Sequence, residues 1–361
     1  MKLKLKIANT LLISAMAFSL AACGSNGNAG SGASSEASGG AGPSASASPS
    51  SPGSGGEPVK VGLLTGTAGL GDKSFNDLAN EGAQSAATDF GIDLKVVEPG
   101  DLAAAEGLLR DLAKAGNELI FAVGFDMVEP LTAVANEYPD KKFAVIDAAV
   151  DLPNVRSLMF KEHEGSFLVG ALAAMMTETN KIGTIPAMDV PFLNRFTAAY
   201  EQGAKYVNPD IEVLNQPIGS DNSAFNDPGK MKNIALSMYS QNVDIIYPVA
   251  GGSGTGLFEA AKEQNKYAFG INSDQDDMAQ GLVLTSMLKR VDTAVYDTIS
   301  RFVGGHFEAG LQEYGLSNNG IGLTEMKYTK DIIGSENIGK LSEIQQNIMT
   351  GEIEVIDITA Q

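Results

Sequence analysis

The stretch VKVGLLTGTAGLGDKSFN, residues 59–76, decides the fold class of this chain. It opens with a run at 59–64 that is apolar except for Lys60, which is typical of a strand buried on both faces of a parallel sheet. A glycine loop follows, with Gly66, Gly69 and Gly71, and a helical pattern begins directly after it. A strand that leads through such a loop into a helix N-terminus is where open α/β sheets bind ligands.

The end of this loop holds three candidate ligand-binding residues, Asp72, Phe75 and Asn76. An aromatic ring followed by an amide can stack on a flat ligand and hydrogen-bond to its edge. The alternative is an ordinary first turn of an α/β sheet, with Phe75 buried in the core.

Length and composition narrow the class of protein. A chain of 361 residues suits roughly two to three domain-sized units. The formal net charge of −19 argues against a nucleic-acid partner, because phosphate backbones are bound by clustered Lys and Arg. One cysteine and two histidines leave little room for a metal site or a disulfide framework. We therefore expect no metal and no other cofactor.

The N-terminus is typical of an exported lipoprotein. Three lysines precede a largely apolar segment at 7–20, which has the length of the apolar region of a signal peptide. The sequence LAACG at 20–24 resembles the bacterial lipobox, in which the cysteine is diacylated and becomes the mature N-terminus. We expect residues 1–22 to be a signal peptide and Cys23 to carry lipid at the extracytoplasmic face of the cell membrane.

Removal of residues 1–22 takes away three lysines and no acidic residue, which leaves 22 basic against 44 acidic residues. Anionic lipid would not attract such a chain, so the membrane anchor would be the lipid itself. Residues 23–57 are mostly Ser, Gly, Ala and Pro, a composition that predicts a disordered tether. Its reach would be about 30 Å.

From residue 59 onward, apolar runs alternate with helical patterns. The first series predicts strands at 59–64, 94–98, 119–123, 143–146 and 157–160, with helices at 75–90, 102–115 and 128–138. The second series begins with a helix at 165–176. It continues with strands at 181–185, 211–216, 244–249, 267–271 and 283–288, and with helices at 195–206, 230–241 and 256–264. Two such series in tandem predict an α/β protein with two doubly wound lobes.

The pattern changes after residue 291. We expect a helix at 292–303, short segments through 322, a helix at 342–349 and a short strand at 353–358. Segments that follow two complete lobes usually return to pack on both. This predicts a hinge of several strands, with a ligand held in the cleft between the lobes.

Several blocks of sequence now support a comparison with a known family. They are GDKSFN at 71–76, FAVGF at 121–125, EGSFLVG at 164–170, MDVP at 188–191, AGGSG at 250–254 and SMLKRVD at 286–292. In this order they resemble the basic membrane protein family of lipoproteins, which includes purine nucleoside receptors that feed ABC transporters. The resemblance covers nearly all of residues 59–358.

The resemblance implies the type I periplasmic-binding-protein fold, with two Rossmann-like lobes joined by a three-strand hinge. The N-terminal lobe would comprise 58–161 plus about 290–320, and the C-terminal lobe 162–289 plus about 321–361. It also implies a monomeric receptor, not an enzyme, that captures nucleosides, purine nucleosides in particular, and delivers them to ABC permease subunits.

The resemblance also assigns roles to single residues. Phe75 resembles one side of an aromatic sandwich around a nucleobase, with Asn76 as a polar contact to the base. Phe225 resembles the opposite aromatic, and its alternative is a hydrophobic staple before the following helix. Each aromatic ring would contribute roughly 1–3 kcal/mol to the free energy of binding, by analogy with stacking in single-stranded nucleic acids.

Five further candidates line the same expected cleft. The backbone at Gly251 and Gly252 would approach a sugar closely, and Lys289 would donate to ribose hydroxyls. Either Asp126 or Glu129 would accept hydrogen bonds from base nitrogens, and the sequence does not separate them.

The chain departs from the family pattern at three positions. Gly66 and Gly71 stand where the family often has aspartate, and Asn272 stands where aspartate is common. An asparagine offers one carbonyl acceptor and an amide donor in place of a carboxylate. We keep Asn272 as a candidate contact to the ribose, with Asp274 as a nearby substitute.

Motifs typical of enzymes are missing from the sequence beyond the tether. Neither G-x-S-x-G nor a phosphate-binding or dinucleotide-binding glycine loop occurs there. His163 lies near a predicted crossing between the lobes and is interpreted as a solvated or hinge-lining residue rather than a catalytic one. The alternatives to a nucleoside receptor are a receptor of the same fold for a sugar or a signalling molecule, or a regulatory surface lipoprotein without a transport role.

Overall fold

The computed structural model describes residues 57–359. The predicted signal peptide, the lipidation site Cys23 and nearly all of the predicted tether lie outside the described residues. Within the described part, no helix is long and apolar enough to cross a membrane.

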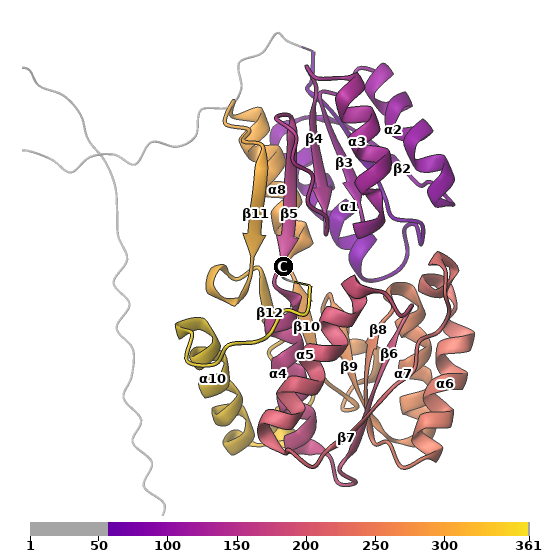
Figure 1. The fold of residues 1–361 in the computed structure, drawn as a ribbon, viewed down its shortest axis with the longest axis vertical. Coiled ribbons are helices and arrows are strands. Elements are labelled where there is room, and N and C mark those ends of the chain that lie inside the picture. Colours follow the sequence, from indigo (N-terminus) through magenta and orange to yellow (C-terminus); the bar gives the residue numbers. More distant parts are fainter. Residues whose placement is uncertain (1–56, 360–361) are drawn as a thin grey trace, which may run out of the picture. The chain divides into compact units, whose positions relative to one another are not determined.

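The first lobe is built on a six-stranded sheet in the order β11-β5-β4-β3-β1-β2, and all of its strands are parallel (Figure 1). Its strands are β1 Lys60–Leu64, β2 Asp93–Val97, β3 Leu119–Val123, β4 Lys142–Ile146, β5 Val155–Phe160 and β11 Gly310–Tyr314. Its helices are α1 Phe75–Phe90, α2 Ala105–Lys114, α3 Val128–Glu137 and α8 Val291–Val303. Successive residues of β1 face opposite sides of the sheet, so Leu63 belongs to the core under α1 while Leu64 belongs to the core under α2 and α3. Burial on both faces explains why the central strands β1, β3 and β4 read as largely apolar runs.

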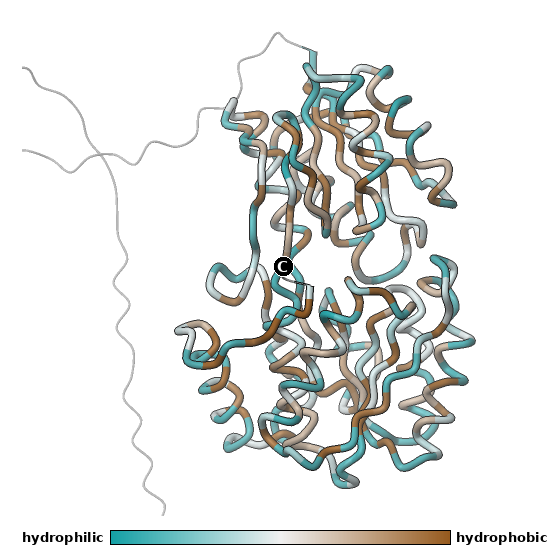
Figure 2. Tube along the Cα trace, viewed as in Figure 1, coloured by the Kyte–Doolittle hydropathy of each residue, from teal (hydrophilic) through white to brown (hydrophobic). Residues whose placement is uncertain are grey.

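The second lobe has a sheet in the order β12-β10-β9-β8-β6-β7, in which only β12 is antiparallel to its neighbour. Its strands are β6 Lys181–Pro186, β7 Glu212–Asn215, β8 Ile245–Val249, β9 Tyr267–Asn272, β10 Val283–Lys289 and β12 Ile321–Leu323. Its helices are α4 Glu162–Met176, α5 Pro191–Val207, α6 Pro228–Ser240, α7 Thr255–Gln264, α9 Lys330–Ile333 and α10 Ser335–Thr350. Figure 2 shows the hydrophobic residues concentrated along the strands of both sheets.

Two glycines allow α4 and α5 to approach closely. A Cβ atom built on Gly170 would lie 1.9 Å from the Tyr200 carbonyl oxygen, and one built on Gly203 would lie 1.9 Å from the Phe167 carbonyl oxygen. No larger residue fits at either position without moving backbone. This contact fixes α5, whose first turn reaches the ligand cavity described below.

The chain crosses between the lobes three times (Figure 1). The crossings are Lys161 between β5 and α4, Arg290 between β10 and α8, and residues 315–320 between β11 and β12. Two doubly wound lobes with three crossings confirm the predicted fold class.

The predicted strand at 353–358 is wrong. This segment follows α10 without joining a sheet, and the backbone N–H and carbonyl of Ile356 bond instead to the side chain of Gln202. Ile353 and Val355 pack against the core while Ile356 and Ile358 are exposed. The alternation of buried and exposed residues that suggests a strand is therefore real, but the segment pairs with no strand of either sheet. The helix predicted at 342–349 is also longer, because α10 begins at Ser335.

Candidate ligand-binding site

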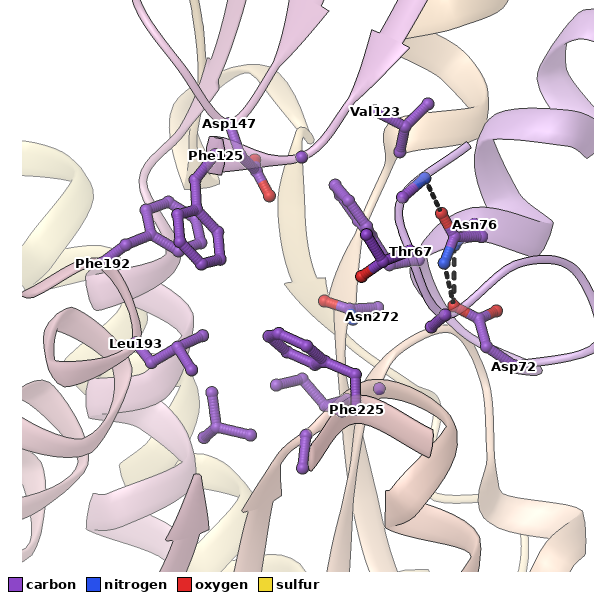
Figure 3. A pocket seen from close by; sticks show the side chains of 18 of the residues that line it. Thr67, Asp72, Asn76, Val123, Phe125, Asp147, Phe192, Leu193, Phe225 and Asn272 are labelled. Atoms are coloured by element: carbon purple, nitrogen blue, oxygen red, sulfur yellow. Dashed lines mark hydrogen bonds between the residues drawn. The ribbon is translucent and has the colours of Figure 1, made fainter. Parts of the chain in front are cut away.

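A cavity lies between the two lobes, at the carboxyl ends of strands from both sheets (Figure 3). Its volume is about 90 Å³, measured as the space open to the centres of water molecules. Open α/β sheets bind ligands at this edge because adjacent connections diverge there. The strand ends contribute Gly66, Thr67, Phe125, Asp147, Gly251, Asn272 and Lys289.

The lobes touch around this cavity, so the cleft is closed. Phe125 of the first lobe stacks on Phe192 of the second, with ring centroids 4.9 Å apart. Hydrogen bonds also join the lobes, among them Asn272 Nδ2 to Ser74 Oγ at 2.9 Å, Ser273 Oγ to the Lys73 carbonyl at 2.7 Å and Asn222 Nδ2 to Asp126 Oδ2 at 2.7 Å. A ligand would enter when these contacts open and would be enclosed when they form.

The two predicted aromatic residues both line the cavity, one from each lobe. Phe75 is the first residue of α1, and Phe225 lies in the short helical turn Asn222–Asn226. Figure 3 shows the Phe225 ring pointing into the cavity. Gly251 lies directly beside this ring. Its φ is 51°, and a Cβ there would lie 3.6 Å from Phe225 Cδ1, which is ordinary van der Waals contact. Phe75 also packs against the core. The two sequence interpretations, a ring in the ligand cavity and a ring in the core, therefore describe different faces of one side chain.

Asp72 and Asn76 also line the cavity, but most of their hydrogen-bonding groups are used within the loop (Figure 3). The Asp72 carboxylate accepts from the backbone N–H groups of Ser74, Asn76 and Asp77 and from Asn76 Nδ2. Asn76 Oδ1 accepts from the Gly66 N–H at 2.7 Å. Burial raises the pKa of Asp72 despite these bonds. Both side chains therefore shape the loop between β1 and α1.

The remaining candidates separate into two groups. Asp126 lines the cavity, whereas Glu129 is exposed on the first turn of α3. Gly252 lies just outside the lining, where a Cβ would approach the Asp72 Cα at 3.5 Å. Asp274 is exposed, and its Oδ1 accepts from the Asp276 N–H. The geometry thus favours Asp126 over Glu129 and Asn272 over Asp274.

Lys289 is the centre of a buried ionic cluster at the back of the cavity. Its Nζ lies 2.6 Å from Asp147 Oδ2 in the first lobe and 2.8 Å from Glu162 Oε1 in the second. The same nitrogen lies 4.9–5.8 Å from four ring centroids, those of Phe75, Phe160, Phe192 and Phe196. Carboxylates and aromatic faces together stabilise the buried ammonium.

Two acceptor atoms in the cavity are buried without a hydrogen-bond partner in the described chain: Asp147 Oδ1 and Asn272 Oδ1. Both residues adopt left-handed backbone, with φ of 67° and 66°. An unsatisfied buried acceptor costs about 1–3 kcal/mol. Burial also raises the pKa of Asp147, and the neighbouring Lys289 opposes that rise. These atoms are placed to accept hydrogen bonds from a ligand that carries hydroxyl or N–H groups.

Sequence reasoning missed Asp147, Phe125, Phe192 and Phe196. A usable signal existed for Asp147, which directly follows the buried strand β4, at the edge where ligands bind. Phe192 and Phe196 are four residues apart on α5, a spacing that places both on one helix face. That spacing alone does not say what the face contacts.

His163 lies two residues after the Lys161 crossing and is buried beside Arg195, so of the two sequence interpretations the hinge-lining one agrees with the structure and the solvated one is wrong. Burial and the Arg195 charge lower its pKa. Above about pH 6.5 the imidazole is neutral in both folded and unfolded chains. Below that pH the unfolded chain gains the proton first, so acidification destabilises the fold.

We expect the free energy of unfolding to fall as the pH drops from about 7 to 5.5, with a slope of up to about 1.4 kcal/mol per pH unit from this one group. His163→Gln should remove that part of the slope. Urea denaturation of both proteins across this range measures it, and parallel pH profiles would contradict the prediction.

Two lobes closed around a cavity with aromatic walls and unsatisfied acceptors define a solute-binding protein. The family model described as "ABC transporter substrate-binding protein PnrA-like" matches residues 59–359. The chain belongs to this family, Bmp, which is a family of substrate-binding receptors for ABC transporters.

Known relatives agree with this assignment. The chain is 31% identical to the "ABC transporter nucleoside-binding protein BmpA" of Lactococcus lactis, over 83% of this chain and 87% of the relative. It is 34% identical to "Basic membrane protein A" of Borreliella burgdorferi, over 83% and 88%. A crystal structure of an ABC transporter solute-binding protein from Aeropyrum pernix matches with a TM-score of 0.77 and 31% identity, over 84% of this chain and 95% of that one.

Proposed function

We propose that this protein captures nucleosides, purine nucleosides in particular, in the cleft between its lobes and delivers them to the permease of an ABC transporter. One observation carries the proposal: aromatic rings from both lobes, Phe75 and Phe225, line the cavity that also holds the unsatisfied acceptors of Asp147 and Asn272. A planar base fits between aromatic faces, and ribose hydroxyls are donors for such acceptors. The printed name of the Lactococcus relative supports the same ligand class.

Ligand binding would shift the lobes from open to closed. The contacts that close the cleft, Phe125 with Phe192 and Asn222 with Asp126, form only when the lobes meet. A ligand that touches both lobes binds the closed state better and therefore increases its population.

The proposal places the folded part outside the cytoplasm, as a monomer held at the cell membrane by lipid on Cys23 and by the tether of residues 23–57. Three relatives from Pyrococcus species are named as lipoproteins, which supports the anchor. Loss of palmitate labelling in Cys23→Ser would check it.

Isothermal calorimetry tests the ligand. The chain from residue 57 onward would be refolded from denaturant to remove carried ligand and titrated with adenosine, guanosine, inosine, cytidine, uridine and ribose. We expect nucleosides to bind and ribose to bind more weakly by about 1–3 kcal/mol or more, because ribose lacks a ring for the aromatic walls.

The comparison among nucleosides then separates purine from pyrimidine preference. Binding of ribose or another sugar without binding of any nucleoside would replace the proposal with a sugar receptor of the same fold. A bound nucleoside recovered unchanged after long incubation would agree with a receptor rather than an enzyme.

A further inference from the structure

The C-terminal segment, residues 351–359, is held at two places near the hinge. The Ile356 N–H donates to Gln202 Oε1, and Gln202 Nε2 donates to the Ile356 carbonyl, both at 3.0 Å. One residue further on, Asp357 accepts from Arg195 Nε at 3.0 Å and from Arg195 Nη2 at 2.7 Å. Thr359 donates to the same carboxylate from its N–H and its hydroxyl. Figure 1 shows this segment running from α10 toward the junction of β5 and α4.

A series of charged contacts connects Asp357 to the ligand cavity. Arg195 Nη1 lies 3.1 Å from Glu162 Oε2. The Glu162 side chain is fully buried, and its other oxygen, Oε1, accepts from Lys289 Nζ at 2.8 Å. Lys289 lines the cavity and Asp357 does not. Three contacts therefore separate a residue of the C-terminal segment from an amine in the binding site.

The geometry of these contacts makes Asp357 important for the position of Lys289. The contact between Arg195 and Glu162 Oε2 is a buried ion pair at 3.1 Å without hydrogen-bond geometry, so it attracts the guanidinium but does not fix its orientation. The other contacts of Arg195 are long: the Phe160 carbonyl at 3.4 Å, His163 Nδ1 at 3.3 Å, and the Phe192 ring, whose centroid is 6.0 Å from Cζ. The two hydrogen bonds to Asp357 fix the orientation of the planar Arg195 guanidinium. The fixed guanidinium in turn sets the orientation of the Glu162 carboxylate, and this carboxylate sets the position of the Lys289 ammonium.

We propose that Asp357 is a positioning residue for ligand binding, which acts through Arg195 and Glu162 to hold the amine of Lys289 at the cavity. Loss of its charge would free the guanidinium to move closer to Glu162. The Glu162 carboxylate would then turn from Lys289 toward Arg195, and the ammonium would lose one of its two anchors.

The test compares Asp357→Asn with a matched control, Glu354→Gln, which makes the same chemical change at an exposed position of the same segment. Both would be made in the chain from residue 57 onward, which lies within one compact unit. The first readout needs no ligand: the ¹H–¹⁵N spectrum of lysine ammonium groups, in which Lys289→Arg assigns the Lys289 signal. We expect this signal to shift or broaden in Asp357→Asn and to stay unchanged in Glu354→Gln.

The second readout is affinity for inosine, and it rests on the proposed function. We expect the Kd to rise about three- to tenfold in Asp357→Asn, in the range found for residues that act on a site from a distance. Asp357→Glu, which keeps the carboxylate, should restore most of the affinity. In a Lys289→Gln background, Asp357→Asn should have no further effect on Kd, whereas a merely structural role would lower affinity in both backgrounds.

The outcomes separate the two proposals. An unchanged Lys289 signal in Asp357→Asn overturns the positioning role, and so does a changed signal with an unchanged Kd. If the parent chain binds no nucleoside, the proposed function fails, and the spectrum alone then decides whether Asp357 positions Lys289. The spectrum also decides if Lys289→Gln does not fold.

Discussion

Lys289→Met should lower the free energy of unfolding by about 3–5 kcal/mol at neutral pH and weaken ligand binding. Methionine fills most of the same volume among the four phenylalanine rings but removes the charge. Asp147 and Glu162 would then lie close together in the protein interior with no ammonium between them. The cost is that of two carboxylates buried without their shared cation.

The pH dependence of this loss identifies its cause. Burial already raises the pKa of Asp147, and Lys289 opposes the rise. Without Lys289 the pKa of Asp147 should rise further, so protonation at mildly acidic pH would neutralise the unpaired charge. The difference in unfolding free energy between the parent and Lys289→Met should therefore be smaller at pH 5 than at pH 8.

Urea denaturation at both pH values measures the effect, with Lys262→Met as the control. Lys262 forms an exposed pair with Glu259 at 3.1 Å, and the loss of such a pair costs about 0–1 kcal/mol. Equal losses in the two variants would show that the buried cluster contributes no more than a surface ion pair.

The fold was predictable because burial on both faces leaves a direct mark on sequence. Strands such as β1 and β3 appear as apolar runs, and the glycine loop after β1 marks the edge where ligands bind. The loop itself pointed to Phe75, and the resemblance to a known family supplied its partner Phe225, at a separation of 150 residues that no local pattern could bridge.

The ionic cluster was not predictable in this way. Lys289 pairs with Asp147, 142 residues away in the sequence, and with Glu162, 127 residues away. Arg195 pairs with Asp357, 162 residues away. Which charges pair depends on how the lobes return to the hinge, and residue type and spacing do not encode that. The error at 353–358 has the same origin, because the pattern of burial was correct and the partner was a helix side chain instead of a strand.

Asp72 and Asn76 illustrate a different limit. Their position in the loop was read correctly, but a carboxylate just before a helix also satisfies free N–H groups of the first turn. The structure shows that use for Asp72. A sequence alone does not say whether a ligand or the backbone takes the hydrogen bond.

Phe225→Ala should weaken nucleoside binding by about 1–3 kcal/mol, roughly 5- to 150-fold in Kd. The ring is half-buried and lines the cavity from the second lobe, whereas Phe75 lines it from the first. Its removal takes away one aromatic wall that only the closed cleft completes, so the loss should appear mainly as faster dissociation. Calorimetry and stopped-flow release of inosine measure the two quantities.

The control for this variant is Phe90→Ala, which removes an equally half-buried ring that packs on Tyr296 in the first lobe, outside the cavity lining. It should lower stability and leave the inosine Kd unchanged. Phe225→Leu should fall between the parent and Phe225→Ala, because leucine restores apolar contact without an aromatic face. If Phe225→Ala binds as tightly as the parent while Phe125→Ala does not, the base lies against the stacked pair Phe125 and Phe192, and the aromatic wall of this receptor is formed by the residues that close its lobes.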